Sequence, residues 1–124
     1  MNIVVDTHAL LWFLTKDKKL SKLAKSSINN SKKVFIPTIV LLELLYTMHK
    51  INIEDKFPLV LKLIKKHKKY AVISLDIAIV EKVAQLTNLL EMHDKVIVAT
   101  ADMLKLPLVS KDSTIQKVYK NIIW

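Results

Sequence analysis

The 124-residue chain contains no cysteine, no glycine and no arginine. Without cysteine it has no disulfide framework, no thiol nucleophile and no cysteine-based zinc or iron–sulfur site, so we expect a cytoplasmic protein. Without glycine it cannot contain the loops that bind dinucleotides or cradle nucleotide phosphates, because those loops need glycine for a tight turn and close backbone approach. These absences exclude several large classes of enzyme.

Long hydrophobic runs are also missing. Asp6 interrupts the apolar N-terminal run and no basic segment precedes it, so we expect no signal peptide. The longest apolar stretch, residues 34–48, contains Pro37 and Glu43 and falls short of the roughly 20 apolar residues that a spanning helix needs. We therefore expect no membrane association.

The residues that are present favour one globular domain with an anionic partner. Hydrophobic residues make up 52% of the chain, which is ample for a core at this length. The chain has twenty lysines and eleven acidic residues, so the formal net charge is +9. An excess of positive charge favours anionic partners, nucleic acid first.

Short apolar runs alternate with longer helical patterns along the chain. The runs are residues 3–5, 34–36, 71–75, 108–109 and, as a possible edge strand, 122–124. Because they are continuous rather than alternating, they are typical of parallel strands covered by helices on both faces. Helix-start signals stand between them at Ser21, Thr38, Asp76, and His93 or Asp94. The pattern predicts one domain over residues 1–124, a three-layer α/β/α sandwich with a central, mostly parallel sheet.

Two acidic residues follow predicted strands directly. Asp6 comes after the first strand and Asp112 after the fourth. Either could be a helix N-cap. However, ligands of such sheets bind outside the carboxyl ends of the strands, where the strand order reverses. Both aspartates are therefore candidate functional residues.

Glu43 lies in the most apolar predicted helix, TIVLLELLYTM. No lysine stands within one helical turn of it, and a buried carboxylate is costly unless it is paired. A salt bridge to a distant lysine, or a position at an edge open to water, would explain it structurally. Otherwise it belongs to a functional site.

Asp94 opens the segment DKVIVATA, whose small residues let a helix pack closely on a sheet. A charge that favours the helix dipole is the structural alternative. If Asp94 converges with the other three acids, their repulsion implies a bound divalent cation, and oxygen ligands select Mg²⁺ or Mn²⁺ over zinc. None of the four histidines (His8, His49, His67 and His93) forms a zinc spacing, and His8 and His93 are at most supporting groups.

The segments IVVDTHALLW, TIVLLELLYTM, HDKVIVATA and PLVSKD, in this order and followed by NIIW, resemble the PIN domain family. In particular, they resemble the VapC-like toxins of prokaryotic toxin–antitoxin pairs. The most specific part is DKVIVATA combined with an N-terminal strand that ends in Asp6 and Thr7. The resemblance covers nearly the whole chain.

The resemblance implies a PIN-like nuclease domain with catalytic, metal-binding carboxylates. The family's acidic positions fall on Asp6, Glu43, Asp94 and Asp112, with Thr7 and Ser110 as candidate supporting hydroxyls. Lys95 stands where the family usually has arginine, and lysine cannot clamp a phosphate in bidentate fashion. The implied activity is a Mg²⁺- or Mn²⁺-dependent endoribonuclease, the toxin of a pair, in which a metal-activated water hydrolyses RNA. The implied partners are a cognate antitoxin and a second copy of the chain.

Two other functions stay open at this point. One is a catalytically silent PIN-type binding module. The other, less favoured, is a phospho-receiver-like signalling domain with Asp76 as phosphoacceptor. Residues 56–70 predict a basic amphipathic helix, and we expect it to pack on the core with a solvated lysine face rather than to form an RNA track.

Overall fold

In the computed structural model, which describes residues 1–124, five strands form one sheet in the order β3-β2-β1-β4-β5. The strands are β1 (Asn2–Val5), β2 (Lys33–Pro37), β3 (Tyr70–Ile73), β4 (Leu108–Val109) and β5 (Ile122–Ile123). Every neighbouring pair is parallel. All five predicted strands are present, with β5 at an edge as expected.

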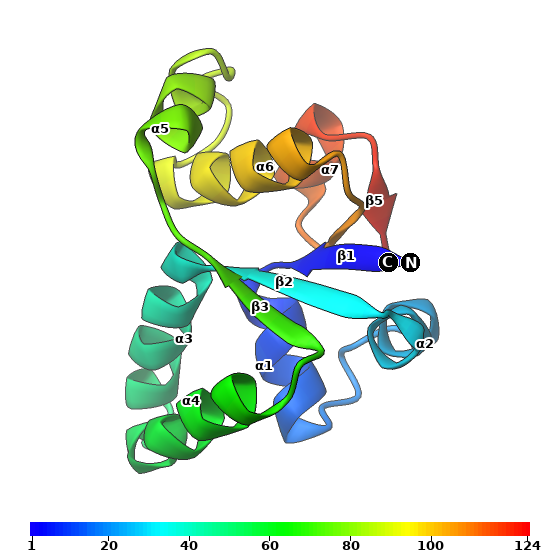
Figure 1. The fold of residues 1–124 in the computed structure, drawn as a ribbon, viewed down its shortest axis with the longest axis vertical. Helices are drawn as coiled ribbons and strands as arrows, with labels where there is room; N and C mark the ends of the chain where they lie inside the picture. The colour runs from blue at the N-terminus through cyan, green and yellow to red at the C-terminus, as the bar shows by residue number, and fades with distance from the viewer.

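Helices cover both faces of the sheet (Figure 1). Below the sheet in this view lie α1 (Thr7–Thr15), α3 (Thr38–Lys50) and α4 (Phe57–Lys66), and α2 (Lys22–Asn30) lies at one end. A short 3₁₀ helix, η1 (Glu54–Lys56), leads into α4. Above the sheet lie α5 (Ile77–Ala84), α6 (Met92–Leu104) and α7 (Ser113–Val118). The predicted three-layer α/β/α sandwich is confirmed.

The hydrophobic core is centred on β1. Ile3, Val4 and Val5 are fully buried, because β1 has a strand on each side and helices on both faces. The edge strand β3 differs, since Val72 is exposed although its sequence is equally apolar. Continuous apolar residues therefore indicate two-sided burial for the central strand but not for this edge.

The first residues of two helices differ from the sequence prediction. Ser21 and Asp76 cap α2 and α5 as expected. Thr38, in contrast, is the first residue of α3 and not its N-cap, which is Pro37, and the Thr38 hydroxyl donates to the Ile73 carbonyl of β3. Helix α6 begins at Met92, which places His93 and Asp94 inside its first turn rather than before it.

Because the chain lacks glycine, two helices end in left-handed lysines. Lys16 follows α1 with φ 55° and Lys105 follows α6 with φ 54°. For a residue with a Cβ this conformation costs about 1 kcal/mol. Helix α4 buries Ile64 and exposes Lys62, Lys65 and Lys66, as expected for a core-packing helix with a solvated face. None of the helices is both long and apolar enough to span a bilayer.

Candidate metal centre

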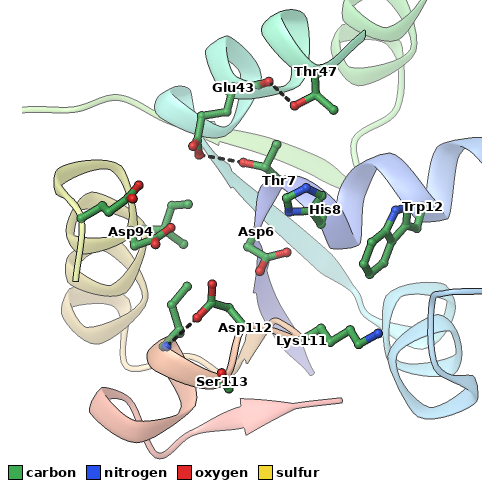
Figure 2. Close-up of a pocket in the computed structure, with 13 residues that line it drawn as sticks. Asp6, Thr7, His8, Trp12, Glu43, Thr47, Asp94, Lys111, Asp112 and Ser113 are labelled. Atoms are coloured by element: carbon green, nitrogen blue, oxygen red, sulfur yellow. Dashed lines mark hydrogen bonds between the residues drawn. The ribbon is translucent and has the colours of Figure 1, made fainter. Parts of the chain in front are cut away.

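The strand order reverses at β1. From β1 the chain moves to β2 and β3 on one side, and after α5 and α6 it returns to β4 on the other side. The carboxyl ends of β1 and β4 therefore flank the position where ligands of such sheets bind. An open pocket of about 580 Å³ lies there. The four predicted acids all line it: Asp6, Glu43, Asp94 and Asp112 (Figure 2).

Asp6 follows β1 directly and is only 7% exposed. Its Oδ1 accepts a hydrogen bond of 2.9 Å from the Ala9 amide, so it caps α1. Burial raises the pKa of this carboxyl group, Asp112 raises it further, and Ser110, the Ala9 amide and His8 oppose that shift. Asp6 is therefore both the cap of α1 and a candidate functional residue.

Asp112 repeats this arrangement after β4. Its Oδ1 accepts a 2.9 Å hydrogen bond from the Ile115 amide and caps α7. Its own amide donates to the Ser110 hydroxyl at 3.1 Å, and Ser110 is fully buried. The turn between β4 and α7 is therefore held at both ends.

Glu43 reaches the pocket from α3. Its Oε1 accepts a 2.8 Å hydrogen bond from the Thr7 hydroxyl, and its Oε2 lies 3.5 Å from His93 Nδ1. The side chain is 28% exposed, so it also reaches water. A lysine salt bridge, one of the structural explanations, is absent.

Asp94 faces the other acids from the first turn of α6 (Figure 2). Its pKa is raised to about 6, first by burial and then by repulsion from Asp112, Glu43, Glu91 and Asp6. The negative charges of these acids therefore act on one another across the pocket. None of the four predicted carboxylates forms an ion pair with a lysine.

The four carboxylates fit a hard divalent cation in their chemistry, because they offer oxygen donors and a negative charge that no lysine ion pair neutralises. No three His, Asp or Glu side chains are grouped closely enough to hold an ion between them. Mg²⁺ does not demand such a cage, since it keeps several waters and binds through one or two carboxylates together with substrate phosphates. The residues present therefore suit Mg²⁺ or Mn²⁺.

The other predicted groups fall into two sets. Thr7 lines the pocket and Ser110 lies buried beneath Asp112. Lys95 is half-buried, does not line the pocket and donates to Asn88 Oδ1 at 3.2 Å. Asp102, a further acid near the ATA segment, is paired with Lys82 at 2.6 Å, outside the pocket.

Sequence analysis did not identify Glu91, Trp12 and Lys111, which also line the pocket. Lys111 had a signal, because it is the neighbour of Asp112. Trp12 stands one helical turn after His8, but an aromatic residue in an apolar helix is usually a core residue, so this spacing alone did not mark it. Glu91 had none, because it stands in a segment without a motif. Only the structure places it at the pocket, where Glu91 directly precedes helix α6.

The comparison with protein families identifies the chain. The model of the PIN domain family matches residues 3–121, and the protein therefore belongs to the PIN domain family. No curated protein sequence matches the chain significantly.

Solved structures share this fold. A toxin–antitoxin complex from Klebsiella pneumoniae has a TM-score of 0.74 at 18% identity, and the match covers 98% of this chain and 96% of the other. VapBC2 from Rickettsia felis, bound to a DNA fragment from its promoter, has a TM-score of 0.71 at 17% identity over 98% and 96%. FitAcB from Neisseria gonorrhoeae has a TM-score of 0.71 at 14% identity over 95% and 92%.

Proposed function

We propose that this protein is a Mg²⁺- or Mn²⁺-dependent endoribonuclease and the toxin of a toxin–antitoxin pair. The observation that carries the proposal is the convergence of four carboxylates without a lysine partner at the strand-order reversal of a PIN domain. The charge distribution supports an RNA substrate. Outside these four acids the chain has twenty lysines and seven acidic residues, which attract a phosphate backbone.

The side chains of the pocket have different proposed roles. Asp6, Glu43, Asp94 and Asp112 would hold the cation, directly or through the waters that it keeps. Thr7 orients the Glu43 carboxylate through its 2.8 Å hydrogen bond. When bound, the ion supplies activation of the attacking water and neutralises charge at the scissile phosphate. No protein nucleophile is needed, which agrees with a chain that has no cysteine.

Of the two alternative functions, only one is compatible with the structure and the family. The phospho-receiver interpretation is wrong, since the chain belongs to the PIN family and Asp76 is an exposed cap of α5 outside the pocket. A silent PIN-type binding module remains the rival. It predicts RNA binding without cleavage, whereas the four acids of the pocket favour cleavage.

Cleavage of RNA by the purified chain, freed of any partner, tests the proposal. We expect cleavage of single-stranded RNA with Mg²⁺ or Mn²⁺, none with EDTA, and recovery when the metal is restored in excess. Titration calorimetry with Mn²⁺ gives a readout that does not depend on activity, and Glu43→Gln should weaken the binding of the ion. Cleavage that persists in EDTA, or no cleavage with either ion, would contradict the proposal.

The proposed antitoxin partner is supported by apolar side chains that the fold leaves exposed. On α3, Tyr46 is 70% exposed beside exposed Leu42, and on α5, Ile77 is 72% exposed beside exposed Val80. One of the solved structures with this fold, from Klebsiella pneumoniae, is a toxin–antitoxin complex by its own description. An amphipathic helix from an antitoxin would cover such residues.

Co-expression tests this part of the proposal. The chain alone should arrest growth, and an adjacent small reading frame should restore growth and yield a co-purifying complex that does not cleave RNA. Light scattering of the chain alone tests the proposed homodimer. Growth arrest by Asp6→Asn equal to that by the wild type would remove RNA cleavage as the cause.

A further inference from the structure

The pocket has two chemically different sides. In Figure 2, Asp94 lies on one side of Asp6, and His8, Trp12 and Lys111 lie on the other. Lys111 is the only lysine among the lining residues, and Trp12 is the largest aromatic side chain there. A metal site accounts for the acidic side of the pocket but gives no role to the aromatic and basic side.

Trp12 stands in a group of rings. It lies on α1 one turn after His8, and their ring centroids are 5.5 Å apart at an angle of 40°. Trp124, in the last position of the chain, meets it at 5.9 Å and 61°, an edge contact. The indole is only partly buried, so packing holds it while some of its surface faces the pocket.

Two ammonium groups lie at this indole. Lys19 and Lys111 each place Nζ 5.8 Å from the centre of the Trp12 ring. Lys111 is presented there by its turn, because Ser110 and Asp112 on either side of it are fixed by hydrogen bonds. The structure thus joins an aromatic surface to two ammonium groups, and one of them, that of Lys111, lines the same pocket as the carboxylates.

This combination matches one nucleotide of an RNA strand. An aromatic side chain stacks on the face of any base, and a lysine beside it neutralises the phosphate of the same strand. Such stacking requires an unpaired base, because the faces of paired bases are covered by their neighbours in the helix. A pocket of about 580 Å³ can take a nucleotide as well as the scissile phosphate.

We propose that Trp12, with His8 and Lys111, forms a nucleoside subsite that binds the base next to the scissile phosphate of single-stranded RNA. The inference rests on the proposed ribonuclease function and adds a substrate preference to it. Trp12 stacks on the base, and Lys111 leaves the indole to contact the adjoining phosphate. Binding there positions the phosphodiester over Asp6 and Asp94 without any sequence-specific hydrogen bond.

Cleavage kinetics with a matched pair of variants test the subsite. Trp12→Leu keeps an apolar side chain for packing but removes the aromatic face, and Trp12→Phe restores such a face. We expect KM for a short single-stranded RNA to rise roughly 10-fold or more in Trp12→Leu, with kcat nearly unchanged, and to return most of the way in Trp12→Phe. Circular dichroism confirms that each variant is folded.

A binding measurement separates this inference from the ribonuclease proposal. In the double variant Asp94→Asn, Trp124→Phe, Trp12 is the only tryptophan, and no cleavage is expected. A single-stranded RNA oligonucleotide should quench its fluorescence. An oligonucleotide of the same length and charge with abasic sites, or the same RNA in a duplex, should quench it at least about five-fold less at equal concentration.

The outcomes point in distinct directions. If the wild type cleaves RNA but Trp12→Leu has the same KM and no quenching occurs, the subsite is wrong and the ribonuclease stands. If RNA quenches the fluorescence but the wild type cleaves nothing, base stacking on Trp12 stands as a binding function and the ribonuclease proposal fails. Equal quenching by abasic and normal oligonucleotides would overturn base stacking, because only the phosphates would then be recognised.

Discussion

Asp6 and Asp76 occupy the same local structure at two different places in the sheet. Each follows a parallel strand, and each caps the next helix with its Oδ1, which accepts from the amide three residues later at 2.9 Å and 3.0 Å. Asp6 ends the central strand β1 and is buried in the pocket. Asp76 comes after the edge strand β3, is exposed, and lies outside the pocket.

The difference teaches what makes a capping carboxylate functional. The cap needs only the short sequence from the strand to the first turn of the helix. Two causes raise the pKa of Asp6, its burial and the nearby charge of Asp112. Both come from the position of β1 next to β4. An edge strand cannot supply either, because it has a neighbouring strand on one side only.

The largest expected effect separates these two aspartates by activity. Asp6→Asn keeps a capping side chain but removes a charged oxygen ligand, so cleavage should fall by at least about 100-fold. Asp76→Asn is the matched control, and its rate should stay within about two-fold of the wild type. Initial rates on one RNA substrate, with melting temperatures of both variants, check the comparison. Equal losses in the two variants would mean that the cap, and not the pocket, matters.

A smaller effect is expected where a hydroxyl positions a carboxylate. Thr7→Val removes the hydrogen bond to Glu43 Oε1 while keeping the shape of the side chain, so kcat should fall roughly 10-fold with little change in KM. Thr15→Val is the control, because that hydroxyl donates to the Leu11 carbonyl at the other end of the same helix. A Thr7→Val enzyme as active as the control would show that Glu43 needs no such support.

The smallest effect concerns stability and comes from the repulsion among the acids. The pKa of Asp94 is about 6 in the folded protein, above its ordinary value of 3.8. The charged form therefore destabilises the folded state above pH 6, and this cost fades as pH falls toward 3.8. In EDTA at pH 7, Asp94→Asn should raise the free energy of unfolding by roughly 1 kcal/mol, because solvent screens the half-exposed group and reduces the full effect of the shift.

Calorimetry at two pH values checks this sign. The variant should melt a few degrees above the wild type at pH 7, and the difference should nearly vanish at pH 4. Excess Mg²⁺ should stabilise the wild type more than the variant, since the variant lacks one ligand. A variant less stable than the wild type at pH 7 would show that Asp94 acts mainly as a favourable charge at the start of α6.

Much of the fold was predictable because its signals are local. The five apolar runs became the five strands, and Ser21 and Asp76 became helix caps, since each depends on a few consecutive residues. Thr38 was predicted less well. It begins the helix instead of capping it, and its hydroxyl donates to the Ile73 carbonyl, a contact across 35 residues that the local sequence does not reveal.

The candidate site was predictable only in part. The four carboxylates stood out because a charge beside or within an apolar segment is costly unless it has a task. Their common pocket confirms that they lie together, while their role in binding metal stays a prediction. Trp12 and Glu91 had to be found in the structure, because an aromatic residue in an apolar helix is usually a core residue and an acid in a loop is usually solvated.

By itself, the sequence determined the alternation of strands and helices, the local caps and the overall positive charge, because these depend on neighbouring residues and on composition. Only the tertiary structure decided which capping aspartate lines a pocket and which lies at the edge. It also decided that Glu43 meets Thr7 and His93, and that Trp12 and Lys111 share one side of the cavity. The physical reason is that these contacts join segments far apart in the chain, and the order of strands in the sheet brings them together.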